Sequence, residues 1–209
     1  MVADGRLRLV LAAEKLFADR GIDAVSLREI NAAAGQRNAS ALQYHFGDRE
    51  GLLKAVMARH LPSVEAARHE LLDAFEAAPP SEPLRPLAGA FVRPLAAKLA
   101  DEEGRRYLLL LDQVVRRASP GVLKASIHEP TSVNRWREIV GPLLPEIAVT
   151  RLHRRFTAIR VTYTELARRA ETGSRDERLF TSHLVDVVAS VLATPVSEET
   201  AALLVTRPG

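Results

Sequence analysis

The stretch that decides the fold of this chain is SLREINAAAGQRNASALQYHF, residues 26–46. Ser26 stands where a helix needs an N-cap, and Glu29 follows three residues later as the partner of a capping box. Apolar residues then recur at helical spacing as far as Ala34. Gly35 tolerates the left-handed backbone of a tight turn, so it ends a short predicted helix.

A second short helix is predicted between this turn and Phe46. Asn38 or Ser40 can cap it, and Leu42 and Phe46 lie four residues apart on one apolar face. Two helices joined by a short turn that contains glycine form a helix-turn-helix, whose second helix can enter the major groove of DNA.

The outer face of this second helix carries side chains that suit DNA. Asn and Gln match the edge of adenine and Arg matches guanine, while Ser, Tyr, His and Arg all bond phosphate oxygens. The alternative is an ordinary solvated face. No Asp or Glu occurs between Gln36 and Gly47, in a chain with 26 of them, which weakens that alternative. The face comprises Arg37, Asn38, Ser40, Gln43, Tyr44 and His45.

Three neighbouring segments carry a resemblance to a known family. They are LFADRGIDAVSLREI, AAAG and YHFGDREGLLKAV, within residues 6–56. In this part the chain resembles the TetR/AcrR family of transcriptional regulators. Asn31 and the pair Gln36-Arg37 depart from the residues usual in that family, and the interval from Gly35 to Phe46 is one residue longer than its commonest spacing.

The resemblance implies a ligand-responsive repressor that binds a pseudo-palindromic operator in double-stranded DNA as a homodimer. The composition, with no apolar run of membrane length and no cysteine, suits a cytoplasmic protein. A small, mostly apolar effector would release the operator. The alternative is a helical interaction or ligand-binding module whose helix-turn-helix is only structural. Matching positions imply base contacts by Arg28, Asn38, Ser40 and Gln43, and phosphate contacts by Ser26, Tyr44, His45, Arg49 and Lys54.

The remainder of the chain reads as helical, so we predict an all-α fold of about nine or ten helices. An N-terminal three-helix domain occupies residues 1–50, and a C-terminal helical bundle occupies residues 51–209. The first helix is expected over Asp4–Asp19. Pro62 predicts a kink or a break in the helix that follows the DNA-binding motif. One long helix is expected over Ile147–Ala170 and another over Asp176–Ala193.

Composition excludes several classes of protein. With 47% apolar residues the chain can bury a sizeable core, but it has no apolar run of about 18 residues, so we expect no membrane contact. Without cysteine it has neither disulfides nor thiolate metal sites. None of the six histidines lies in a His-Glu-x-x-His motif, and no phosphate loop or Gly-x-Ser-x-Gly is present. We therefore expect no enzyme, no metal and no cofactor.

The C-terminal part offers polar side chains within apolar stretches, which is the usual composition of a small-molecule pocket. The alternative is that each of these groups is satisfied inside the helical bundle. The candidate pocket residues are Tyr107, Gln113, Trp136, Arg160 and Tyr163.

The last two long helices carry more apolar residues than one internal face needs, which predicts a self-complementary dimer surface. The alternative is that these residues only close the core of one protomer. The candidate interface residues are Phe156, Phe180, Leu184, Val187, Val188 and Val191.

Overall fold

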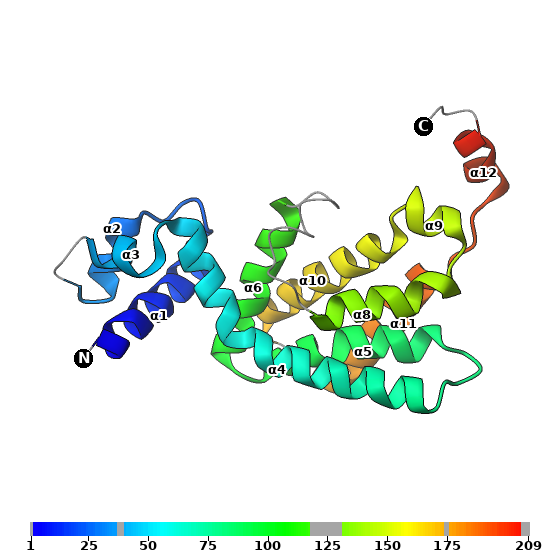
Figure 1. Cartoon of the computed structure of the whole chain (residues 1–209), viewed down its shortest axis with the longest axis horizontal. Coiled ribbons are helices and arrows are strands. Elements are labelled where there is room, and N and C mark those ends of the chain that lie inside the picture. The colour runs from blue at the N-terminus through cyan, green and yellow to red at the C-terminus, as the bar shows by residue number, and fades with distance from the viewer. Residues whose placement is uncertain (1, 37–39, 118–130, 174–175, 206–209) are drawn as a thin grey trace.

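The computed structural model describes residues 2–36, 40–117, 131–173 and 176–205, and all regular structure in them is helical. The predicted all-α fold is confirmed. Figure 1 shows α1–α3 grouped at one end of an elongated molecule, with α4 running from them along the other helices. The elements are α1 (Val2–Arg20), α2 (Leu27–Ala33), α3 (Ser40–Phe46), α4 (Arg49–Ala77), α5 (Leu84–Ala96), η1 (Ala97–Ala100), α6 (Glu102–Arg117), α8 (Thr131–Val140), η2 (Gly141–Leu143), α9 (Glu146–Thr150), α10 (Arg154–Thr172), α11 (Glu177–Ala193) and α12 (Glu198–Val205).

The N-terminal domain is held together by one apolar stripe of α1. Leu9, Ala13 and Phe17 follow one another at intervals of four residues and are fully buried. Gly21, with φ +93°, ends the helix in a conformation that disfavours side chains. Ile22 then returns the chain to the same core, which fixes where α2 begins.

Helix α4 belongs to both domains. Asp48 caps it by accepting a hydrogen bond from the Gly51 amide at 2.8 Å, so the predicted boundary after residue 50 falls in its first turn. The helix continues through Pro62, and the expected alternative of a break there is wrong. Pro62 is exposed, and the Ser63 hydroxyl donates to the His60 carbonyl at 3.0 Å.

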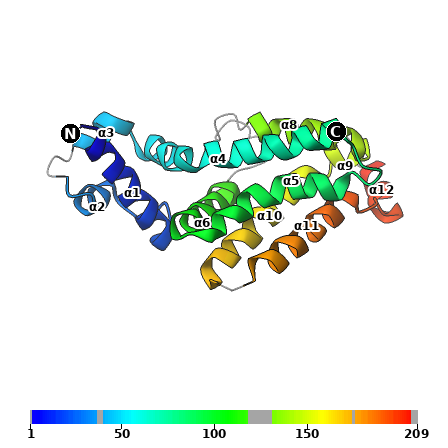
Figure 2. The same cartoon turned by 90° about the horizontal axis from the view of Figure 1, so that it is seen from below.

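The C-terminal domain is a layered helical bundle. Figure 2 shows α5 and α6 between α4 and the pair α10 and α11. An aromatic cluster forms its centre: the ring of Phe91 lies 4.7 Å from that of Trp136 and 5.8 Å from that of Tyr163, between centroids. The Trp136 indole donates to the Leu87 carbonyl at 2.8 Å.

The single long helix expected over Ile147–Ala170 is wrong, because the chain forms α9 and α10 with a turn between them. His153 in that turn has φ +50°, a left-handed conformation that glycine usually adopts, so the sequence gives no sign of it. Arg154 follows it with its side chain buried, and its guanidinium donates to the Thr194 carbonyl. A contact with a distant segment therefore accompanies the turn, which local periodicity cannot reveal.

Within the part of the chain that the structure describes, no single helix is long and apolar enough to cross a membrane. The bent pair α11 and α12 meets that test by length and composition only.

Candidate DNA-binding surface and its link to the C-terminal domain

The start of α2 is fixed by the predicted capping box. The Ser26 hydroxyl accepts from the Glu29 amide at 3.2 Å, and the Ser26 amide donates to the Glu29 carboxylate at 2.8 Å. Arg20 pairs with the other carboxylate oxygen at 2.7 Å. The backbone and side-chain hydrogen bonds of Ser26, together with Arg20, lower the pKa of Glu29 to about 2. The carboxylate is thus ionised near the helix N-terminus, where a negative charge is favourable.

Helix α3 presents polar side chains outward from a buried anchor. Leu42 is fully buried, and Phe46 is half-buried beneath the Arg6 guanidinium, 5.2 Å from its ring centre. Gln43 is exposed and Tyr44 is 84% exposed. The side chains of Gln43 and Tyr44 can therefore contact the major groove of DNA without any rearrangement of the core.

The other predicted DNA contacts lie around this helix. His45 is half-buried, with its ring centre 5.2 Å from that of Tyr44. Arg28 on α2 is exposed, and Lys54 on α4 is exposed and 3.2 Å from the Glu50 carboxylate. Asn38 lies outside the described residues, as does the side chain of Ser40, the first residue of α3.

Arg49, a predicted phosphate contact, makes hydrogen bonds within the protein. Its guanidinium is half-buried, and Nη1 donates to the carbonyls of Ile22 and Val25, in the segment that precedes α2. Arg49 therefore ties the start of α4 to the start of the helix-turn-helix. Sequence reasoning missed this role, because nothing in the local pattern pairs an arginine with carbonyls some 25 residues away.

Gln113 joins the two domains. Its side-chain oxygen accepts from the Ile22 amide at 3.0 Å, and its nitrogen lies 3.4 Å from the Phe17 carbonyl as a donor. The predicted pocket residue Gln113 is thus engaged at the junction between α6 and the end of α1. Arg160, another predicted pocket residue, is exposed on α10, 6.0 Å from the ring centre of Phe156. Tyr107, Trp136 and Tyr163 are buried in the C-terminal core.

A second junction surrounds a buried carboxylate on α1. Glu14 is only 1% exposed; Arg59 donates to one of its oxygens, and His60 Nε2 lies 3.3 Å from the same oxygen. Arg59 also pairs with Glu103 of α6 at 2.8 Å. The sequence signal for this junction is the glutamate that interrupts the apolar stripe of the first helix.

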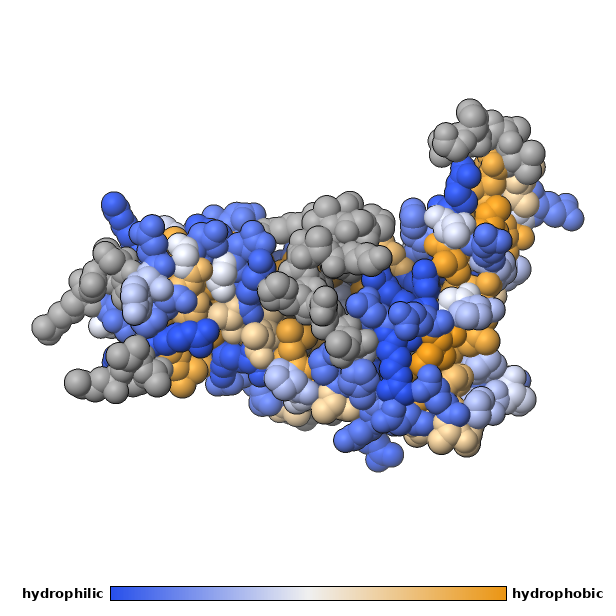
Figure 3. All heavy atoms as spheres, viewed as in Figure 1, coloured by the Kyte–Doolittle hydropathy of each residue, from blue (hydrophilic) through white to orange (hydrophobic). Residues whose placement is uncertain are grey.

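The candidate dimer surface divides into two sets. Phe156, Leu184 and Val188 are buried inside the protomer, so their assignment to an interface is corrected: they close its own core. Phe180, Val187 and Val191 are half-buried, and Phe180 and Val191 also pack against the protomer's core. Leu179 at the start of α11 is 66% exposed. Figure 3 shows further hydrophobic surface on the projecting helix α12.

The described residues contain no group of three or more His, Asp or Glu side chains that could hold a metal ion.

Comparison with known proteins identifies the N-terminal domain. Residues 9–56 match the family model described as bacterial regulatory proteins, tetR family, and the resemblance seen in the sequence is confirmed. No curated protein matches the chain.

Solved structures share the fold over most of the chain. A TetR family regulator from Rhodococcus RHA1 is 20% identical, covering 90% of this chain and 96% of its own, with a TM-score of 0.57. The regulator PfmR from Thermus thermophilus is 23% identical, covering 87% of this chain and 94% of its own, with a TM-score of 0.53. These solved structures are under 25% identical to the chain, so they show its fold, and the family match concerns residues 9–56.

Proposed function

We propose that this protein, whose residues 9–56 carry the N-terminal domain of the tetR family of bacterial regulatory proteins, is an effector-controlled repressor in the cytoplasm. It would bind a pseudo-palindromic operator as a homodimer, with residues 1–50 on the DNA and residues 51–209 forming the dimer and the receptor. One observation carries the proposal: α3 holds Gln43 and Tyr44 outward above the buried Leu42, with no carboxylate in the helix.

The contacts divide by chemistry. Gln43 offers the paired donor and acceptor that match adenine, and Arg28 offers the fork that matches guanine. Asn38 and Ser40 are proposed as further base contacts. Tyr44, His45 and Lys54 would bond phosphates, which set register and not sequence. Ser26 and Arg49 are proposed phosphate contacts whose groups already make internal hydrogen bonds, so their larger contribution is to fix the angles of α2 and α4.

Two copies are required by the geometry of DNA. Successive major grooves on one face of the duplex lie about 34–36 Å apart, so a second α3 must come from a second protomer. The apolar side chains of α11 that remain open to solvent are the proposed contact between protomers.

Operator release requires the receptor to communicate with α3. Helix α4 enters both domains, and Gln113, Glu14 and His60 join α6, α1 and α4 by direct contacts. An effector that binds better to one arrangement of these helices shifts the protein toward it and changes operator affinity by the same coupling free energy.

Selection of bound sequences from a random duplex pool, followed by equilibrium binding at fixed salt, tests the proposal. Gln43→Ala should lose about 1–3 kcal/mol of discrimination at particular base pairs. Lys15→Ala, an exposed residue on α1 paired with Asp19, is the matched control and should bind like wild type. Failure to enrich any sequence, or equal selectivity of Gln43→Ala and wild type, would contradict the proposal.

A further inference from the structure

An arginine is buried in the centre of the C-terminal domain. Arg68 of α4 is 1% exposed and follows Val64 by four residues on the face that packs into the core. Its Nη1 donates to the Ser132 hydroxyl at 2.8 Å and lies 3.5 Å from a Glu65 carboxylate oxygen. Its guanidinium lies 5.0 Å from the ring centre of Phe91. Such a charge is costly to bury unless its hydrogen bonds are complete.

The hydrogen bonds of Arg68 are incomplete. Nε is buried and has no partner in the described part of the chain. The Glu65 carboxylate lies at the limit of hydrogen-bond distance from Arg68, and it also accepts from the Ser132 amide at 2.9 Å and from the Ser132 hydroxyl. The guanidinium therefore retains a donor group that faces the core without an acceptor.

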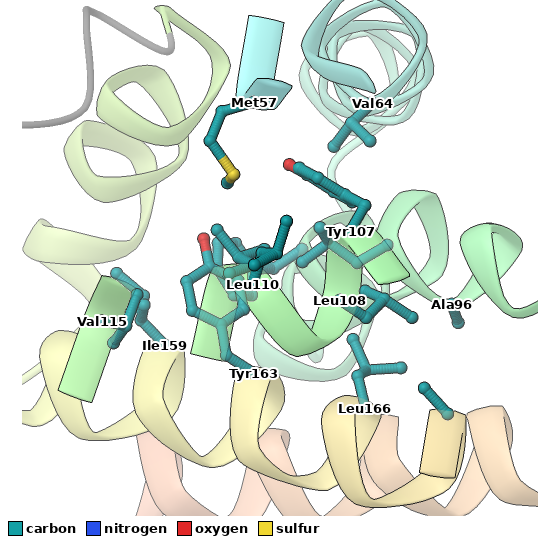
Figure 4. Packing of buried hydrophobic residues seen from close by; sticks show 14 of the residues in the cluster. Met57, Val64, Ala96, Tyr107, Leu108, Leu110, Val115, Ile159, Tyr163 and Leu166 are labelled. Carbon is teal, nitrogen blue, oxygen red and sulfur yellow. The ribbon is translucent and has the colours of Figure 1, made fainter. Parts of the chain in front are cut away.

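Two tyrosines add donors to the same region. Tyr107 of α6 and Tyr163 of α10 are both buried in the core of the C-terminal domain. Figure 4 shows both hydroxyl groups pointing toward the side of the bundle where Met57 lies. Arg68 and Tyr163 both lie against the Phe91 ring, with the guanidinium 5.0 Å and the Tyr163 ring centre 5.8 Å from its centre. Burial raises the pKa of both phenols, and the positive charge of Arg68 opposes this rise in each case. At neutral pH both hydroxyls remain protonated donors.

The balance of charge around these groups is positive. Arg137 of α8 is half-buried, and its charge, like that of Arg68, opposes the rise in the pKa of Tyr163. Arg155 donates to the Arg137 carbonyl at 2.7 Å. Burial, then the charge of Arg155, lowers the pKa of Arg137. Among the described groups whose charges act on the two tyrosines, Glu65 is the one carboxylate. A second negative charge would relieve an unfavourable arrangement.

We propose that Arg68, Tyr107 and Tyr163 bind the carboxylate of a small organic acid, with its apolar body against Met57 and Leu110, and that such an acid is the effector. The inference rests on the proposed function and names the class of its ligand. Arg68 Nε is a donor without an acceptor and both hydroxyls can donate, so a carboxylate can accept from all three groups. An ammonium group would be repelled by the Arg68 charge, and a neutral hydrocarbon offers Nε no acceptor.

The position of Tyr107 connects this site to the N-terminal domain. Its ring is stacked on His60, with centroids 4.6 Å apart, and His60 contacts Glu14 of α1. A carboxylate that moves Tyr107 therefore acts on His60, the α4 residue that contacts Glu14. Binding at this site thus reaches the DNA-binding domain through packed side chains.

Matched acids and alcohols test the proposal on the full-length protein. The probes are benzoate, 4-phenylbutyrate and decanoate, each compared with the alcohol of the same body. The readouts are thermal melting and the fluorescence of Trp136, the only tryptophan, which packs on the Phe91 ring beside Arg68. At least one acid should bind ten-fold or more tightly than its alcohol.

Variants locate the binding. Arg68→Met should abolish the preference for the acid, and the double variant Tyr107→Phe with Tyr163→Phe, which keeps both rings, should weaken acid binding several-fold even if Arg68→Met does not fold. Arg85→Met, at an exposed pair with Asp186, is the control and should bind as wild type does. Binding of no acid, equal binding of acid and alcohol, or wild-type binding by the double variant would overturn the proposal.

Binding of the acid is measured without DNA, which separates the two proposals. If an acid binds through these residues but no operator can be selected, the proposal that the protein binds an operator is contradicted, whereas the proposed acid-binding site is supported. If an operator is bound and no acid binds or releases it, only the assignment of the effector fails.

Discussion

The imidazole of His60 is stacked on the phenol of Tyr107, with ring centroids 4.6 Å apart and planes inclined by 22°. The same imidazole lies 3.3 Å from the buried carboxylate of Glu14. One side chain of α4 therefore touches both the core of the C-terminal domain and the first helix of the N-terminal domain. Packed side chains with two discrete arrangements are the kind of connection through which allosteric coupling travels.

Removing the cation beside Glu14 should be costly. In Arg59→Met the carboxylate stays buried without its guanidinium, so we expect the free energy of unfolding to fall by about 3 kcal/mol, the lower part of the range for broken buried pairs, because Arg59 is itself a quarter exposed. Urea denaturation at pH 7 measures this. Arg85→Met removes one partner of an exposed pair and should cost at most about 1 kcal/mol.

The double variant Glu14→Leu with Arg59→Met checks the cause. Replacing both charges by apolar groups removes the unpaired carboxylate, so most of the lost stability should return. A double variant as unstable as Arg59→Met alone would show that the loss comes from packing and not from charge.

The hydrogen bond between Gln113 and the Ile22 amide can be tested by two substitutions of similar size. Gln113→Leu leaves the N–H of the buried residue Ile22 without its side-chain acceptor and should cost about 1–3 kcal/mol. Gln113→Glu keeps an acceptor at the same place and should cost less. Hydrogen exchange at the Ile22 amide should accelerate in the leucine variant only; equal protection in both variants would mean that the bond contributes nothing.

The capping box predicts a pH dependence in the acid range. The folded pKa of Glu29, about 2, lies below its unfolded value of 4.5, so ionised Glu29 stabilises α2 above pH 4.5 and this contribution is lost as the pH falls toward 2. The slope of melting temperature against pH over that interval should be smaller in Glu29→Gln than in wild type. Ser26→Ala, which removes a main hydrogen-bond partner, should raise the pKa of Glu29 in a carboxyl NMR titration. An unchanged pKa would contradict the assignment.

Local features of the fold were predictable because they are local in the sequence. Ser26, Glu29 and Gly35 announce a short capped helix within ten residues, and the structure has it. Long-range contacts left weaker signals. The left-handed His153 and the carbonyl contacts of Arg49 depend on segments far away in the chain, whereas a charged residue inside an apolar stripe, as at Glu14, marks a buried pair in advance.

The same reasoning separates the candidate site residues. Exposure on a short helix follows from period alone, so Gln43 and Tyr44 could be placed outward from the sequence. The helical periodicity of the apolar residues does not tell whether one of them faces the core of its own protomer or a partner, since apolar residues occur on both faces of α11. Leu184 and Val188 were therefore predicted at the dimer interface although they are buried within the protomer. Arg68 was overlooked because it occupies a core-facing position of α4, where an apolar residue is expected.

The two faces of α11 make the dimer testable. Leu179 is exposed and Val187 and Val191 are half-buried at intervals of eight and four residues, whereas Leu184 and Val188 lie on the buried stripe against the protomer's own helices. Val187→Asp would place two unpaired charges near the proposed two-fold axis without entering the core. We expect it to fold, with wild-type helicity by circular dichroism, and to sediment as a monomer that no longer binds operator. Val188→Asp, one residue away but fully buried, should instead lose its structure. A folded Val187→Asp variant that sediments as a dimer would move the interface to another surface, because a charge at the centre of an apolar contact cannot remain there unpaired.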